Sequence, residues 1–142
     1  MNLKNILSQA LKERWSTGHF NASELDQMRA IVEACAELGS PAIIGTSEGE
    51  RTHIGLAEAV ALRDILAREY GIPVFLNADH TKSVAAAKAA IDAGYDSVHI
   101  DLSALPLEEN IKGTAEVVEY ARFKVASLKF QVNIEGELGI LK

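Results

Sequence analysis

Ser97-Val98-His99-Ile100-Asp101 alternates polar and apolar side chains, and this alternation decides the fold that the sequence predicts. Successive side chains of a strand point to opposite faces, so the three polar residues share one face and Val98 and Ile100 share the other. One face of this strand is therefore polar, and only the opposite face needs apolar cover.

Three other predicted strands, within 42–47, 72–79 and 131–137, divide their faces in a similar way. On one face of each lie apolar residues such as Ile44, Leu76 and Ile134. The opposite faces carry Ile43, Gly45, Ser47, Phe75, Asn77, Asp79, Gln131, Asn133, Glu135 and Glu137. The same period of two thus recurs along the chain.

A repeating unit of a short apolar strand, a polar exit and a helix organises the sequence. An opening amphipathic helix carries Leu3, Ile6, Leu7 and Leu11 at helical spacing. The predicted strands are a first ending near Phe20 and then 42–47, 72–78, 97–101 and 130–136. Four predicted helices follow the opening one. The first has a capped start at Ser23, with Asp26 three residues on, and ends before Gly39. The others run from Ile54 to Gly71, over 83–93 and over 108–125. Strands that alternate with helices predict an α/β fold with a parallel sheet.

Two architectures place helices around a parallel sheet, and the polar face separates them. An open, doubly wound sheet is covered by helices on both faces and is apolar on both, whereas a barrel has a lumen that accepts polar groups near its top. The sequence therefore favours a (β/α)8 TIM-barrel type of fold. Such barrels need eight strands and about 250 residues. We expect residues 1–142 to form a single domain, a partial barrel of about five parallel strands, with the opening helix over its bottom or side.

Composition and charge narrow the classes of function. The chain is 48% hydrophobic and 24% charged, which is typical of a globular domain. A net charge of -6 and the lack of a basic stripe argue against nucleic acid and membrane partners. No signal peptide or long apolar run is visible, so we expect a cytoplasmic protein. Cys35 falls in a helical apolar pattern and is predicted to be a buried structural thiol.

Ionisable residues gather where the predicted strands end. Asp79 and His80 follow the third strand, Asp101 ends the fourth, and Glu137 follows the fifth, with Ser47 at the end of the second. This end of the strands is where barrel enzymes build their sites. Carboxylates and an imidazole that converge would repel one another without a cation between them, so the pattern predicts a divalent metal. His80 supplies the nitrogen ligand that zinc prefers.

Structural roles account for other residues of the same types. Asp79 alone could be an acid that caps the next helix, and His99 is expected to be a buried core histidine with a satisfied partner. His19 and His53 carry no signal of their own. The sequence lacks the glycine-rich phosphate loops and the G-x-S-x-G nucleophile elbow, which removes the common nucleotide-binding and serine hydrolase interpretations.

With these residues assembled, the sequence resembles the amino-terminal part of the class II, metal-dependent fructose-bisphosphate and tagatose-bisphosphate aldolases. The resemblance spans the whole chain. It rests on Gly18-His19-Phe20-Asn21, Ser40-Pro41-Ala42-Ile43-Ile44 with Ser47-Glu48-Gly49, Asp79-His80, Ile100-Asp101-Leu102-Ser103, Leu105-Pro106-Leu107-Glu108-Glu109-Asn110, and Ile134-Glu135-Gly136-Glu137-Leu138-Gly139.

The resemblance implies zinc-dependent, reversible aldol cleavage of a ketose 1,6-bisphosphate to dihydroxyacetone phosphate and glyceraldehyde 3-phosphate. In that reaction a metal ion stabilises the enediolate as a Lewis acid. The implied roles are acid/base catalysis for Asp79 and metal binding for His80, Asp101 and Glu137. Asn21 and Ser47 match positions near the substrate. The family also implies a sugar-phosphate substrate and a homo-oligomer, with Zn²⁺ or another divalent metal as cofactor. Lys82 is given no role, because this chemistry needs no Schiff base.

The sequence departs from the family pattern in two places. The family usually has histidine two residues before the catalytic aspartate, where this chain has Asn77, which affects a hydrogen bond near the metal site. The chain also ends at Lys142, before the further histidines and phosphate-binding loops that the resemblance implies. We therefore expect an incomplete, weakly active or inactive aldolase chain.

Two alternatives remain open at the level of sequence. One is a non-catalytic half-barrel module whose unpaired edge strands associate with another copy or another protein. The other is a different metal-dependent barrel enzyme that acts on a sugar phosphate, such as an epimerase. The sequence does not choose between fructose and tagatose bisphosphate.

Overall fold

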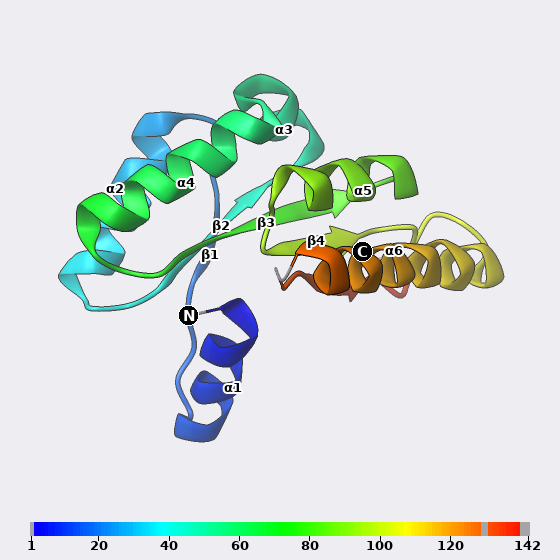
Figure 1. Cartoon of the computed structure of the whole chain (residues 1–142), viewed down its shortest axis with the longest axis horizontal. Helices are drawn as coiled ribbons and strands as arrows, with labels where there is room; N and C mark the ends of the chain where they lie inside the picture. The colour runs from blue at the N-terminus through cyan, green and yellow to red at the C-terminus, as the bar shows by residue number, and fades with distance from the viewer. Residues whose placement is uncertain (1, 129–130, 140–142) are drawn as a thin grey trace.

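The strands of the chain run parallel and pair in the order in which they occur in the sequence (Figure 1). This computed structural model describes residues 2–128 and 131–139. The strands are β1 (His19–Asn21), β2 (Ala42–Thr46), β3 (Val74–Thr81), β4 (Ser97–Ile100) and β5 (Asn133–Gly136). A doubly wound sheet reverses its strand order at a switch point, and this sheet does not. The order confirms the predicted α/β barrel segment of five strands.

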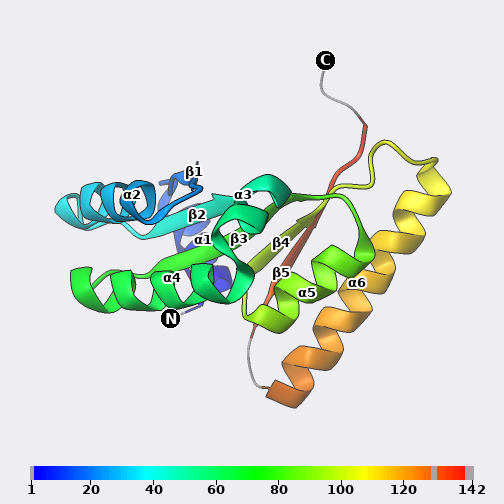
Figure 2. The same ribbon diagram turned by 90° about the horizontal axis from the view of Figure 1, so that it is seen from above.

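Helices cover the two faces of the sheet unequally. They are α1 (Leu3–Glu13), α2 (Leu25–Glu37), α3 (Glu48–Ile54), α4 (Leu56–Tyr70), α5 (Val84–Ala93) and α6 (Leu107–Leu128). Helices α2, α4 and α5 lie on one side of the sheet, while α1 lies on the other (Figures 1 and 2). None of the helices described is long and apolar enough to cross a membrane.

The main hydrophobic core lies between the sheet and its outer helices. The strands contribute the predicted apolar face, which includes Ile44, Leu76 and Val98, and each of these three is fully buried. The helices contribute Met28, Val32, Cys35, Ala59, Leu66, Ala87, Ala90, Ile91, Val117 and Ala121. Cys35 is buried as predicted, and its burial raises the pKa of the thiol. Alternation along the strands therefore identified the face that packs on the helices.

The opposite face of the sheet has a small apolar cluster of its own. Leu3 and Ile6 of α1 pack there against Ile43 and Phe75, near the starts of β2 and β3. Helix α1 thus closes the lower part of the face that carries the polar side chains, as the amphipathic pattern predicted. The buried stripe differs in detail, because Leu11 is 83% exposed.

A short helix that the sequence did not predict precedes the predicted helix from Ile54 to Gly71. Ser47 and Glu50 form a capping box that starts α3 at Glu48, each side chain pairing with the backbone amide of the other residue. Gly55, with a φ of 92°, separates α3 from α4. The prediction of one helix from Ile54 to Gly71 missed α3, because a short polar helix has no apolar period to reveal it.

Smaller differences concern the ends of elements. Helix α2 has Glu24 as its N-cap, while the amide and hydroxyl of Ser23 donate hydrogen bonds to the Gln27 side chain. The predicted cap at Ser23 with Asp26 is therefore wrong. The described part of the fifth strand starts at Asn133, and Phe130, its predicted first residue, lies outside the described residues.

The contact between α1 and the sheet gives a test of the closed lower end. Ile6→Ala removes a buried side chain from the α1 cluster and is expected to destabilise the protein by about 2–5 kcal/mol. Leu11→Ala on the same helix removes an exposed side chain and should change stability by less than about 0.5 kcal/mol. Urea unfolding of both variants measures the difference. Equal effects would show that α1 does not stabilise the sheet.

Candidate active site

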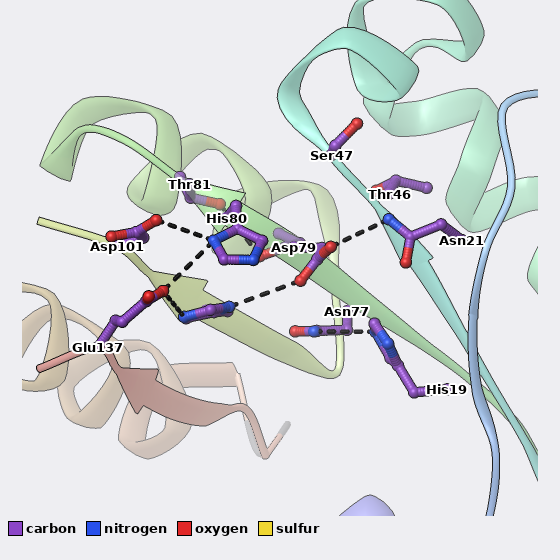
Figure 3. Close-up of polar contacts among 12 residues, drawn as sticks. His19, Asn21, Thr46, Ser47, Asn77, Asp79, His80, Thr81, Asp101 and Glu137 are labelled. Atoms are coloured by element: carbon purple, nitrogen blue, oxygen red, sulfur yellow. Dashed lines mark hydrogen bonds and ion pairs between the residues drawn. The ribbon is translucent and has the colours of Figure 1, made fainter. Parts of the chain in front are cut away.

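Strand β3 brings an acid and an imidazole to the same side of the sheet. The pairing register of β3 with β4 shifts between Ala78 and Thr81, and His80 has a left-handed backbone with a φ of 40°. In a regular strand, Asp79 and His80 would point to opposite faces. The irregularity lets both side chains point into one cavity (Figure 3). β3 therefore extends past Ala78, where the predicted strand ended.

His80 meets one carboxylate from each of the two following βα units. Its Nδ1 lies 2.8 Å from Asp101 Oδ2 and 3.3 Å from Glu137 Oε2. Asp101 directly follows β4, and Glu137 directly follows β5. The Asp101 hydrogen bond raises the pKa of His80 above its ordinary value, with Asp79 and Glu137 adding to the effect, while burial opposes it. The three potential ligand atoms lie within 4.8 Å of one another.

Asp101 is the most firmly held acid of this group. Its side chain is 4% exposed, and Oδ1 accepts hydrogen bonds from the amide and hydroxyl of Ser103 at 3.1 and 2.6 Å. The Lys82 ammonium contacts Oδ2. Burial alone would raise the pKa of Asp101, but these donors outweigh it and hold the pKa far below its usual range. Lys82, for which the sequence suggested no role, therefore balances the charge of Asp101 from an exposed position.

Glu137 carries an unsatisfied oxygen inside the cluster. Its backbone carbonyl accepts a hydrogen bond of 2.8 Å from the Asn110 amide, which fixes the chain at the end of β5. Oε2 is buried and has no hydrogen-bond partner, although nitrogens of His99 and His80 lie 3.1 and 3.3 Å away. A buried carboxylate oxygen without a donor is costly unless a cation balances it. The imidazole and two carboxylates suit Zn²⁺ or another divalent cation.

Asp79 stands beside this group and is oriented separately from it. Asn21 donates hydrogen bonds to Asp79 Oδ2 at 3.0 Å and to Glu50 Oε2 at 3.2 Å. Burial alone would raise the pKa of Asp79, but the Asn21 hydrogen bond, His80 and His99 together lower it. The carboxylate is thus charged at neutral pH and directed toward the cavity.

Ser47 lies at the end of β2 but outside the cluster. Its hydroxyl accepts from the Glu50 amide at 3.5 Å as the cap of α3, and it points away from Asp79 and His80 (Figure 3). Glu50, from the same helix, reaches the site through Asn21 instead. Sequence reasoning missed Glu50, because its role depends on α3.

His99 is buried as predicted, but its neighbours belong to the site. The His99 and His80 rings lie against each other with centroids 4.5 Å apart and are tilted by 48°. Its Nδ1 lies 3.5 Å from Asp79 Oδ1, and its Nε2 faces Glu137. Asp79, His80 and His99 form a second group with ligand atoms within 4.8 Å. The signal in the sequence was its place on the polar face of β4.

Arg51 supports the backbone of the site at the ends of β2 and β3 and was not identified from the sequence. Its buried guanidinium contacts the Thr46 carbonyl and donates to the Asp79 carbonyl at 3.2 Å and to Thr81 Oγ1 at 3.0 Å. It therefore binds the residues on both sides of His80 and joins β2 to β3. Burial lowers the pKa of Arg51, and nearby acidic groups oppose this effect.

The cavity beneath these residues has a volume of about 420 Å³ and extends down to Leu3 of α1. Asn77 lines it and hydrogen-bonds to His19 Nε2 at 3.1 Å. The other end of the Asn77 amide, Oδ1, is buried without a hydrogen-bond partner. The residue that departs from the family pattern thus pairs with a histidine of β1.

Comparison with known proteins connects this geometry to one family. The whole chain, residues 1–142, matches the family model described as fructose-bisphosphate aldolase class-II. It is 38% identical to a fructose-bisphosphate aldolase of Geobacillus stearothermophilus over 147 residues, which cover 99% of this chain and 48% of the relative. A fructose-bisphosphate aldolase of Treponema pallidum is 36% identical over 149 residues, covering 99% of this chain and 43% of its own length.

A solved structure shares the fold. The X-ray structure of the YdjI aldolase from Escherichia coli K12 matches with a TM-score of 0.81 and 25% sequence identity, covering 100% of this chain and 53% of its own. The chain therefore spans about half the length of the relatives that it matches.

The raised pKa of His80 predicts how the stability of the metal-free protein depends on pH. Because its folded-state pKa exceeds the unfolded value of about 6.5, its stabilising contribution is complete below that pH and is lost as pH rises through the folded pKa. The urea midpoint of the wild type should therefore fall, relative to His80→Gln, as the pH rises above about 6.5 in the presence of a chelator. The exposed His53 provides the control His53→Gln. Parallel curves for wild type and His80→Gln would contradict the prediction.

Proposed function

The chain belongs to the class-II fructose-bisphosphate aldolase family, and we propose that it takes part in reversible aldol cleavage of a ketose 1,6-bisphosphate. The products would be dihydroxyacetone phosphate and glyceraldehyde 3-phosphate. The observation that carries this proposal is the convergence of His80, Asp101 and Glu137 beside Asp79 at the carboxyl end of the sheet. The family is metal-dependent, and these three side chains form one of two groups among the described residues that could hold a metal ion.

We assign the metal to His80, Asp101 and Glu137, with Zn²⁺ as the preferred ion because an imidazole is among the ligands. The buried, unpaired Oε2 of Glu137 supports the fit. When bound, the cation supplies positive charge where negative charge develops on the substrate. Asp101, held by Ser103 and Lys82, fixes the orientation of His80.

Asp79 is proposed as the acid/base. It would accept the proton of the substrate hydroxyl during cleavage and return it during condensation. Its lowered pKa keeps it ready to accept a proton at neutral pH, and Asn21 holds Oδ2 in place. Asn21 is the better placed of the two proposed substrate residues, because its amide contacts Asp79, whereas the Ser47 hydroxyl points away from Asp79 and His80 (Figure 3).

A second copy of the chain is the partner that we propose. Among the described strands, β1 and β5 are paired on one side only. Beside β5 lies a groove of about 430 Å³ whose lining includes Ile111 of α6 and Leu138. These two side chains are 60% and 81% exposed. A parallel sheet edge beside apolar side chains favours association.

Metal binding tests the proposed site. The chain is expected to bind Zn²⁺ in competition with a chromophoric chelator, and His80→Ala should weaken binding at least about 10-fold, since it removes the nitrogen ligand. His53→Ala, at an exposed position of α3, is the control and should bind as the wild type does. Equal affinity in wild type and His80→Ala would rule out this metal site.

The role of Asp79 is tested by turnover. Asp79→Asn keeps the shape of the side chain but cannot accept the proton, so cleavage of fructose or tagatose 1,6-bisphosphate should fall by about 10²- to 10⁴-fold with Zn²⁺ affinity nearly unchanged. Product aldehyde is measured with a coupled enzyme. The assay uses the oligomeric form of the protein that shows the highest activity. Wild-type rates in Asp79→Asn would exclude Asp79 as the acid/base.

The assembly is tested by its mass in solution. Ile111→Glu places a charge in the α6 groove and should convert the oligomer to monomer in sedimentation equilibrium. Leu38→Glu changes a side chain that is 83% exposed after α2 and should leave the mass unchanged. A wild-type monomer at micromolar concentration, with and without Zn²⁺, would contradict self-association.

A further inference from the structure

We propose that His99 is a positioning residue that sets Asp79 and Glu137 relative to each other and to His80. The inference rests on the proposed function, because it assigns His99 a task in the same site. It adds a residue for which the sequence indicated only burial in the core.

The contacts of His99 place it at the centre of the site. Within the described parts of the chain, it is the one residue with ion-pairing distances to both the Asp79 and the Glu137 carboxylates, at 3.5 and 3.1 Å. Its ring also lies against the His80 ring, tilted relative to it by 48°.

The sheet topology explains why a histidine at this position can reach both acids. Strand β4 lies between β3 and β5, and Asp79 and Glu137 belong to these two flanking segments. An imidazole has a nitrogen at two separate points of a rigid ring, so one nitrogen can face each neighbour. An aliphatic side chain of similar size would fill the same space without a polar contact to either carboxylate.

Burial makes this arrangement effective. The His99 side chain is only 11% exposed, and the Asp79 and Glu137 side chains are 17% and 20% exposed. Carboxylates in such surroundings repel each other with little screening. A polar ring between them keeps each one directed toward its proposed task, proton transfer for Asp79 and metal binding for Glu137.

The contact with His80 extends the effect to the nitrogen ligand. The His80 side chain is 49% exposed, so the few contacts that it makes limit the rotation of its ring. Asp101 holds one edge of this ring through Nδ1, and the tilted His99 ring lies beside it with the centroids 4.5 Å apart. His99 therefore limits the orientation of the His80 ring.

Replacement of His99 should weaken the site without changing its ligands. Loss of residues that orient metal ligands typically costs 10- to 100-fold in metal affinity. We expect His99→Leu to lose Co²⁺ affinity in this range. His99→Gln retains an amide that can donate to Glu137, and it should recover most of the affinity.

The experiment compares the wild type, His99→Leu, His99→Gln, His80→Ala and the control His53→Leu as purified chains. Co²⁺ affinity is measured by calorimetry, and the visible absorption of the Co²⁺-saturated protein reports the ligand set. Circular dichroism and thermal unfolding of the metal-free chains check the fold, and His99→Gln provides the comparison if His99→Leu unfolds.

Positioning by His99 is supported if His99→Leu binds 10- to 100-fold more weakly, His99→Gln recovers, and both saturated spectra keep the wild-type shape. Wild-type affinity in His99→Leu, or no recovery in a folded His99→Gln, overturns it. Spectra altered in both variants also overturn it, because His99 would then be a ligand. Equal Co²⁺ affinity in wild type and His80→Ala is a different result, since it removes the proposed metal site and the role of His99 with it.

Discussion

Parallel pairing in chain order is the constraint on which the rest of the structure depends. It brings the carboxyl ends of β3, β4 and β5 to one edge, where Asp79, Asp101 and Glu137 must lie close together. These charges are tolerated because each has fixed partners: Asn21 for Asp79, Ser103 and Lys82 for Asp101, and the His80 and His99 imidazoles beside Glu137. Oε2 of Glu137 has no hydrogen-bond partner, so the protein alone does not fully balance the charge of this carboxylate.

Much of this arrangement could be predicted from the sequence, because it follows from a period of two. The alternation in 97–101 and 131–137 separates the face that packs on helices from the face that carries Asp101 and Glu137. The strand order and the position of α1 also follow from the patterns of apolar residues. Local spacing was sufficient wherever a residue acts through the regular geometry of its own element.

The features that the sequence did not reveal depend on irregular backbone or on contacts between elements. The bulge in β3 carries His80 to the same side as Asp79, which no alternating pattern predicts. Glu50 and Arg51 lie on a short polar helix. Their partners Asn21, at the end of β1, and Asp79 and Thr81, near the end of β3, are distant in the chain. Arg51 can be recognised only when the carbonyl groups around it are in place.

The position of α1 also determines where the protein can be labelled or attached to a surface away from the site. Because α1 packs against the starts of β2 and β3, the polar cavity is bounded below by Leu3, and the proposed ligands lie toward the carboxyl ends of the strands. A surface attachment or a fluorescent label can be introduced at an exposed residue of α1, for example Leu11. It would lie on the opposite side of the sheet from α2, α4 and α5, and below the mouth of the site. Immobilised protein would keep that mouth turned toward solution.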